Sequence, residues 1–129
     1  MPLEGMKIMR KIDTLKKNYE FSNVLKKGEY FVKKHVTVYI EKNKINKNVI
    51  GIAVNTKTFG AVRRNHIKRL IREAFYKERE NLKKGYNIVF LWNKRESAES
   101  ARFQTIHKEI AEIFREADIV EKNLSLIHI

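Results

Sequence analysis

Residues 61–75, AVRRNHIKRLIREAF, combine an apolar stripe with a dense set of basic side chains. The positions i, i+3, i+4, i+7 and i+8, which share one face of an α-helix, are occupied by Ile67, Leu70, Ile71, Ala74 and Phe75. This periodicity predicts a helix over about residues 62–82, with Gly85 as a stop, and it requires a core for the stripe to pack against.

Basic residues form a row beside the stripe. The row and the polar arc that widens it consist of Arg64, Asn65, Lys68, Arg69 and Arg72. Arg63 adds another cation to the first two turns, and no acidic residue appears before Glu73. The N-terminal end of a helix carries about half a positive charge, so each cation there costs roughly a few tenths of a kcal/mol. This charge order favours an anionic partner, and phosphate is the obvious candidate.

The overall composition supports a folded, strongly basic protein. The chain has 129 residues, 28 Lys and Arg against 15 Asp and Glu, and a formal net charge of +13. Such a charge favours nucleic acid as a partner, with an anionic membrane surface as the second choice. No apolar run is long enough to span a bilayer and no signal-peptide core is present, so we expect a cytoplasmic protein without a membrane partner. The absence of cysteine fits a reducing compartment.

The remaining periodicities predict an α+β fold. In chain order we expect a helix at 18–27, two strands within 29–40, a strand at 49–55, the basic helix, a strand at 85–92 and a helix at 100–117. This αβββαβα order predicts a sandwich in which helices pack on one face of a four-stranded sheet. We expect residues 1–16 to form a flexible basic arm, 17–118 a single RNA-binding domain and 119–129 a tail. The sequence leaves open whether residues 1–5 and 124–129 are native.

The second strand shows a clean alternation of side chains. We expect Val36, Val38 and Ile40 to face the core. The opposite face then presents His35, Thr37 and Tyr39, a polar and aromatic set suited to a surface or a cleft.

The chain offers little for catalysis of its own. Hydrolysis of RNA by a protein needs metal-binding carboxylates or a positioned acid–base pair. The only two aspartates, Asp13 and Asp118, lie at opposite ends of the chain, and the histidines lack the spacing of a zinc site. We therefore predict no catalytic residue and no metal ligand within this chain.

The basic helix and its surroundings resemble one family closely. The run from Phe59 to Phe75, FGAVRRNHIKRLIREAF, is similar to the arginine-rich "RNR" segment of the bacterial ribonuclease P protein subunit. The opening from Leu15 to Gly28, LKKNYEFSNVLKKG, and the order of the later strands also match, so the resemblance covers about residues 7–118.

This resemblance implies a ribosomal-protein-like α+β fold with a left-handed βαβ crossover. It also implies that the catalyst is a large RNA that uses Mg²⁺, bound mainly by that RNA. The protein would bind the catalytic RNA subunit and the 5′ leader of precursor tRNA, whose removal produces the mature 5′ end. No further protein partner is implied.

The resemblance also assigns roles to residues. The expected RNA-binding set is Lys57, Arg63, Arg64, Asn65, His66, Lys68, Arg69 and Arg72. The expected leader-binding cleft consists of Lys17, Phe21, Leu25, Thr37 and Tyr39. Three features depart from the family pattern: His66 replaces a common arginine, Leu25 replaces a common aromatic residue, and Thr58-Phe-Gly60 replaces the usual Gly-Asn turn.

Two other functions compete with this interpretation. A ribosomal or RNA-chaperone protein could bind structured RNA through the same helix, and an enzyme with its own active site is disfavoured by the shortage of suitable carboxylates. The sequence leaves open the oligomeric state, any preference for leader sequence and any contact of the protein with metal ions.

Overall fold

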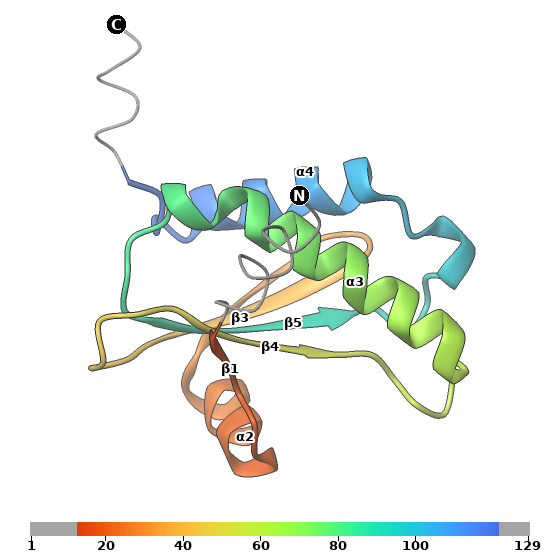
Figure 1. Ribbon diagram of the computed structural model, residues 1–129, viewed down its shortest axis with the longest axis horizontal. Helices are drawn as coiled ribbons and strands as arrows, with labels where there is room; N and C mark the ends of the chain where they lie inside the picture. The colour runs from red at the N-terminus through yellow and green to blue at the C-terminus, as the bar shows by residue number, and fades with distance from the viewer. Residues whose placement is uncertain (1–12, 122–129) are drawn as a thin grey trace, which may run out of the picture.

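Five strands form one sheet in the order β1-β4-β5-β3-β2 within residues 13–121, the part of the chain that this computed structural model describes (Figure 1). They are β1 (Asp13–Thr14), β2 (Glu29–Val32), β3 (Val36–Lys42), β4 (Val49–Ala53) and β5 (Tyr86–Trp92). β3 pairs antiparallel with β2 and β5, whereas β4 pairs parallel with β1 and β5. The prediction of four strands is therefore wrong, because residues 13–14 of the expected arm add a short edge strand.

Between residues 13 and 121, three α-helices pack on this sheet: α2 (Asn18–Lys27), α3 (Ala61–Glu78) and α4 (Phe103–Glu116). Short 3₁₀ turns, η1 (Arg79–Asn81) and η2 (Ala98–Ser100), follow α3 and precede α4. Apart from β1 and the two 3₁₀ turns, the predicted order of helices and strands is confirmed. Residues 1–12 of the predicted arm and 122–129 of the predicted tail lie outside the described residues. Of the tail, Ile119 is buried and Val120 forms a β-bridge with Leu82.

The helices cover both faces of the sheet, not one as predicted. α3 and α4 lie side by side on one face, and α2 lies on the other (Figure 1). The reason is visible in β5, where Ile88 and Phe90 join the core beneath α3 and α4. Val89 between them points the opposite way and is also fully buried, as is Val24 of α2. Both faces of this central strand therefore need a cover.

The main core lies between the sheet and the pair α3–α4. The predicted apolar stripe of α3 is buried in full, as are Val36, Val38 and Ile40 of β3. Phe75, Phe90 and Phe114 meet edge to face, with ring centroids 6.0–6.4 Å apart. This aromatic cluster joins α3, β5 and α4 and holds the basic helix at a defined place on the sheet.

His35 does not lie on the cleft face, where the alternation placed it. It precedes β3 and is buried against α4, where its Nδ1 lies 2.6 Å from Oε2 of Glu109. The other oxygen of this carboxylate accepts hydrogen bonds from the backbone N–H groups of His35 and Val36. The Glu109 carboxylate therefore accepts the backbone hydrogen bonds at the start of β3 and holds the imidazole of His35 against α4.

The predicted crossover connects β4, α3 and β5, and its two strands are parallel neighbours. Its left-handed sense stays a prediction. Across residues 13–121, no helix has the length and apolar character needed to cross a membrane.

Candidate RNA-binding surface

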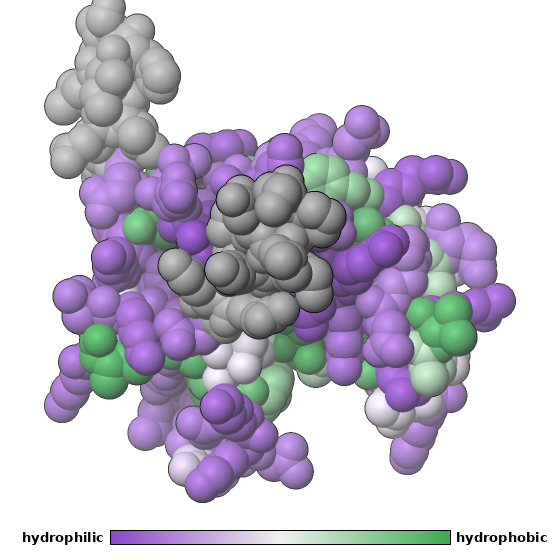
Figure 2. Space-filling view, viewed as in Figure 1, coloured by the Kyte–Doolittle hydropathy of each residue, from purple (hydrophilic) through white to green (hydrophobic). Residues whose placement is uncertain are grey.

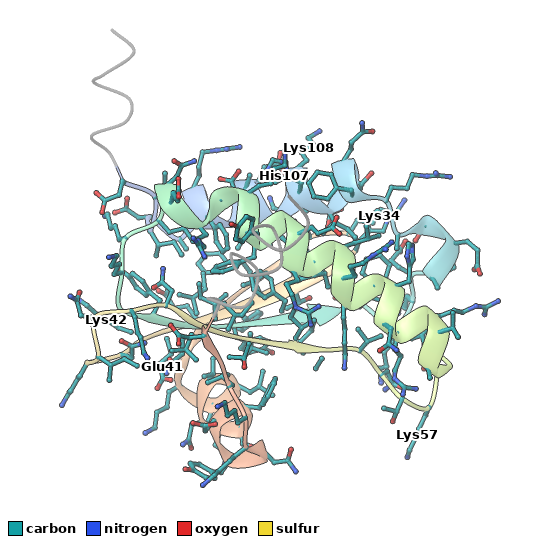
Figure 3. All side chains as sticks on the ribbon, viewed as in Figure 1. Lys34, Glu41, Lys42, Lys57, His107 and Lys108 are labelled. Carbon is teal, nitrogen blue, oxygen red and sulfur yellow. The ribbon has the colours of Figure 1, made fainter. Side chains whose placement is uncertain are left out.

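The loop before α3 is held by its own side chains. The Asn55 side-chain oxygen accepts hydrogen bonds from the backbone N–H groups of Lys57 and Thr58, at 2.9 and 2.8 Å. Phe59 follows and is buried in the main core. Lys57 projects from this loop away from the sheet (Figure 3). The unusual Thr58-Phe-Gly60 sequence thus forms an anchored turn that exposes Lys57.

The first turn of α3 is left without acidic compensation. Gly60 occupies the N-cap and supplies no side-chain cap, and the first turn contains no acidic residue. The guanidinium of Arg64 donates a hydrogen bond to the carbonyl oxygen of Phe59 at 2.9 Å, which fixes its position at the start of the helix. The free N–H groups and the helix dipole at this end favour an anion.

The structure distributes the predicted RNA-binding residues around α3. Lys68 and Arg72 face the β4 edge of the sheet, where they line a small cavity. Asn65 and Arg69 are exposed on the outer side of the helix. Arg63 and His66 lie on the remaining side, next to the segment that leads into α4. The set is therefore spread over the sides of α3 that do not pack on the core, and it does not form one flat patch.

Most of the α3 cations lack an acidic partner. Arg63 pairs with Glu99 at 3.3 Å and Arg69 with Glu73 at 3.9 Å, both at exposed positions. Such exposed pairs contribute little, at about 0–1 kcal/mol each. Within residues 13–121, no ion pair involves Lys57, Arg64, Lys68 or Arg72. Together these four cations form an uncompensated positive surface, suited to a polyanion.

Figure 2 shows that one face of the molecule is largely hydrophilic, with only small separate hydrophobic areas. This view fits a surface that contacts polar or charged partners, because extended apolar patches mark hydrophobic docking sites.

A cavity of about 220 Å³ connects the two predicted functional sets. Lys68 and Arg72 of α3 line it together with Phe21 of α2, around the edge of the sheet formed by β1 and β4. The cations of the RNA-binding set and an aromatic residue of the leader-binding set thus meet at one sheet edge. The sequence had predicted the RNA-binding set and the leader-binding set as two separate surfaces.

Gly51 determines where Phe21 sits. A Cβ atom at position 51 would lie 2.6 Å from two carbon atoms of the Phe21 ring, closer than any real contact. The space above this glycine of β4 thus admits a residue of the protein itself. Phe21 remains partly exposed, so it combines packing with a free ring surface.

Tyr39 lies on the sheet face that carries α2 and has an aromatic neighbour that the prediction missed. Tyr30 of β2 is directly opposite Tyr39, with ring centroids 5.5 Å apart, and is 64% exposed. The sequence places Tyr30 and Val32 two positions apart, and this alternation could have indicated that both side chains lie on one face of β2. Leu25 of α2 is exposed and remains available to a ligand.

Two other predicted cleft residues, Thr37 and Lys17, make contacts within the protein. Thr37 is buried, and its hydroxyl donates to the Asn93 side-chain oxygen at 2.6 Å. Lys17 occupies the N-cap of α2, with its ammonium 5.8 Å from the centre of the Tyr19 ring. There, backbone N–H groups of Lys16 and Lys17 donate to the carboxylate of Glu20 and lower its pKa. The backbone N–H of Phe21 donates to the carbonyl oxygen of Lys17 at 3.4 Å, so Lys17 lies one helical turn before Phe21.

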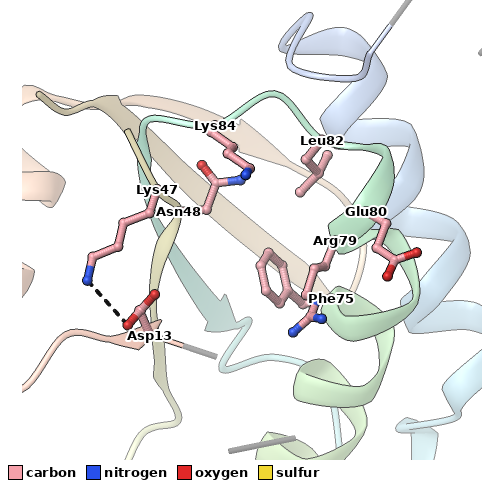
Figure 4. A pocket seen from close by; sticks show the side chains of 8 residues that line it. All are labelled: Asp13, Lys47, Asn48, Phe75, Arg79, Glu80, Leu82 and Lys84. Carbon is pink, nitrogen blue, oxygen red and sulfur yellow. Dashed lines mark hydrogen bonds and ion pairs between the residues drawn. The ribbon is translucent and has the colours of Figure 1, made fainter. Parts of the chain in front are cut away.

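One further cavity and one further His–Glu contact lie away from the predicted site residues. A cavity of about 460 Å³ lies at the C-terminal end of α3, where Lys47 and Asp13 form an ion pair at 3.4 Å (Figure 4), but no predicted site residue lines it. His107 lies 2.7 Å from a carboxylate oxygen of Glu78 and connects α4 to α3. Across the described part of the chain, no group of three or more His, Asp or Glu side chains is arranged to hold a metal ion.

Comparison with known proteins identifies the family of this chain. The family model for ribonuclease P matches residues 9–118. A ribonuclease P protein component from Clostridioides difficile is 40% identical over 106 residues, which cover 81% of this chain and 91% of that protein. Its counterpart from Natranaerobius thermophilus is 30% identical over 90% of this chain and 99% of its own length. The solved structure of the Staphylococcus aureus RNase P protein superposes with a TM-score of 0.74 and 28% identity, covering 86% of this chain and all of that one.

Proposed function

The chain belongs to the ribonuclease P protein family, and from this premise we propose that it binds the catalytic RNA subunit through α3 and the 5′ leader of precursor tRNA beside α2. It is a protein component of the ribonuclease P enzyme complex, and an RNA partner follows from that membership. The division of the two RNAs between two surfaces is the part we propose.

The uncompensated cations of α3 are the observation that carries the RNA-subunit assignment. Arg64, Lys68 and Arg72 share one side of the helix and have no acidic partner among the described residues, and Lys57 extends this surface into the preceding loop. Phosphates of a folded RNA would neutralise these charges and release bound counterions, which supplies most of the affinity in such interfaces. Asn65, Arg69, Arg63 and His66 complete the proposed contact surface.

Exposed aromatic rings support the leader assignment. Tyr39 and its neighbour Tyr30 offer a partly exposed pair on the sheet, while Phe21 presents a ring from α2. Bases of a single strand stack on such rings at about 1–3 kcal/mol each, largely independently of sequence. With Leu25 nearby, these side chains give an open surface for an unpaired RNA segment, with Thr37 in its floor and Lys17 at its mouth.

We further propose that the RNA subunit performs the cleavage. Mg²⁺ prefers carboxylate and phosphate oxygens, whereas the candidate surface consists of cations, an amide and aromatic rings. The surface therefore does not fit a resident Mg²⁺ ion. When bound by the RNA, Mg²⁺ would supply the activated nucleophile for hydrolysis of the phosphodiester. The protein's part is to hold the leader and to neutralise charge.

Reconstitution tests this proposal directly. The protein alone should leave a precursor tRNA intact, whereas the protein with a bacterial ribonuclease P RNA and Mg²⁺ should give one cut at the mature 5′ end. At low Mg²⁺ the RNA alone should be slower than the complex. Site-specific cleavage by protein freed of RNA would contradict the assignment.

Substitutions should separate the two surfaces. Lys68→Ala is expected to weaken binding to the RNA subunit and to lower the salt dependence by about one unit of log–log slope. Tyr39→Ala should leave that affinity unchanged but weaken binding of precursor tRNA to the assembled complex by about 1–3 kcal/mol. Mature tRNA, which lacks the leader, is the control. Equal losses for precursor and mature tRNA would reject the leader assignment of Tyr39.

A further inference from the structure

A groove separates α3 from the segment that leads into α4. Two hollows of about 410 and 480 Å³ share the residues His66, Ala101 and Arg102, and so form one continuous depression. We call it the α3–η2 groove. None of its lining residues also lines the cavity at the β4 edge, where Lys68 and Arg72 lie. It therefore occupies a different side of the basic helix.

The groove has an apolar floor and a basic rim. Its floor contains Leu70, Ala98 and Ala101, whose small or short side chains are almost fully covered. Arg63 and Arg102 stand at the rim and are exposed. Planar guanidinium groups above an apolar floor match the chemistry of a nucleotide, which has a flat base and a phosphate.

The charges of the rim do not cancel each other. Arg63 is paired with Glu99 at 3.3 Å, but this pair is exposed and weakly held. Within residues 13–121, Arg102 takes part in no ion pair. One arginine is therefore free to bind a phosphate, and the other can exchange its carboxylate partner for one.

One end of the groove carries a fixed aromatic ring. Phe103 is partly exposed and stacks on His107, with ring planes 9° apart and centroids 5.5 Å apart. His107 is in turn held by Glu78 of α3, at 2.7 Å. A ring whose orientation is already fixed loses little entropy when a base packs against it.

We propose that the α3–η2 groove binds a nucleotide of a single-stranded RNA segment. The base lies on Ala101 and Phe103, and the phosphate lies between Arg63 and Arg102. This inference rests on the proposed function to the extent that Arg63 and His66 belong to the predicted RNA-binding set. It adds Arg102 and Phe103, and it assigns single-stranded RNA to a side of α3 facing away from the sheet edge.

The experiment uses the full-length protein and a fluorescent single-stranded pentaribonucleotide at physiological salt. Fluorescence anisotropy gives the dissociation constant, and amide chemical shifts show where the oligonucleotide binds. Arg102→Ala is expected to weaken binding about tenfold, the effect of losing one charge-assisted hydrogen bond. Arg115→Ala, which removes an exposed arginine from the far end of the same helix, is the matched control and should change binding less than twofold.

Phe103→Leu tests the stacking surface while keeping an apolar side chain against the core. It should weaken binding about fivefold, and its melting temperature shows whether the fold is intact. Shifted amides at residues 98–104 with this order of affinities support the groove. Equal effects of Arg102→Ala and Arg115→Ala, or shifts confined to residues 64–72, overturn it.

The two proposals fail in distinguishable ways. If reconstitution with the RNA subunit fails but oligonucleotide binding still depends on Arg102, the ribonuclease P assignment falls and the groove stands. If reconstitution succeeds while Arg102→Ala behaves like Arg115→Ala, the groove alone is rejected.

Discussion

Gly51 leaves the space that the ring of Phe21 occupies, and this contact contributes to the packing of α2 on the sheet. Gly51→Ala would place a methyl group 2.6 Å from the ring, so either the ring or the helix must shift. We expect a loss of about 1–3 kcal/mol in the free energy of unfolding, typical of overpacking. Urea unfolding measures it.

A double substitution provides the control. In a Phe21→Ala background the ring is gone, and Gly51→Ala should be neutral or slightly stabilising, because alanine restricts the unfolded chain more than glycine does. An equal loss in both backgrounds would show that the cost does not come from Phe21 but from the backbone of β4 or from Leu15, whose Cδ1 would lie 3.1 Å from the new methyl group.

Residue by residue, the sequence predicted the basic row better than the cleft. The i, i+4 spacing alone determined that Arg64, Lys68 and Arg72 lie together, because helix geometry is local. Tyr30 was missed because its role depends on the register of β2 against β3, which places it opposite Tyr39. His35 was misplaced because a carboxylate 74 residues away attracts it, and strand alternation carries no information about such a partner.

At the scale of elements, the Glu109 carboxylate connects α4 to the start of β3. It is almost fully buried, lies within hydrogen-bond distance of the His35 imidazole and accepts hydrogen bonds from two backbone N–H groups. Glu109→Ala leaves these groups without a partner, and we expect a loss of about 3–5 kcal/mol in the free energy of unfolding. Thermal and urea denaturation give this value.

Glu112→Ala is the matched control on the same helix. Its carboxylate lies 3.9 Å from the ammonium of Lys33 at a partly exposed position, so the expected loss is at most about 1 kcal/mol. Similar losses for the two variants would show that the buried carboxylate has no special role.

The sequence predicted which long periodic segments form helices and strands, but it predicted only part of how these elements are arranged in space. The apolar repeats of α3 and α4 and the alternation of β3 report local geometry directly. β1 has two residues and no period, and it exists only because the edge of β4 is available to it. The position of α2 did leave a signal, because an almost wholly apolar β5 must be covered on both faces. Four strands with helices on one face could not satisfy that requirement.

For the whole molecule, the dominant property is a formal charge of +13 on 129 residues. Self-repulsion among these cations opposes compaction. Part of the charge is concentrated on α3, where Arg64, Lys68 and Arg72 have no acidic partner within residues 13–121. The chain belongs to the ribonuclease P protein family, and phosphates of an RNA partner would neutralise these cations and so reduce the repulsion. The isolated protein is therefore expected to be less stable than its assembled form.

Anions should recover part of this stability. Sulfate or pyrophosphate at millimolar concentration should raise the melting temperature, because an anion that binds only the folded protein stabilises it by RT ln(1 + [L]/Kd), about 2.7 kcal/mol at one hundred times Kd. Chloride at matched ionic strength supplies screening alone and should give a smaller shift. A triple variant, Arg64→Ala, Lys68→Ala and Arg72→Ala, should lose most of the difference between the two salts. If sulfate and chloride act equally on the native sequence, the α3 cations form no anion site, and their effect is general repulsion.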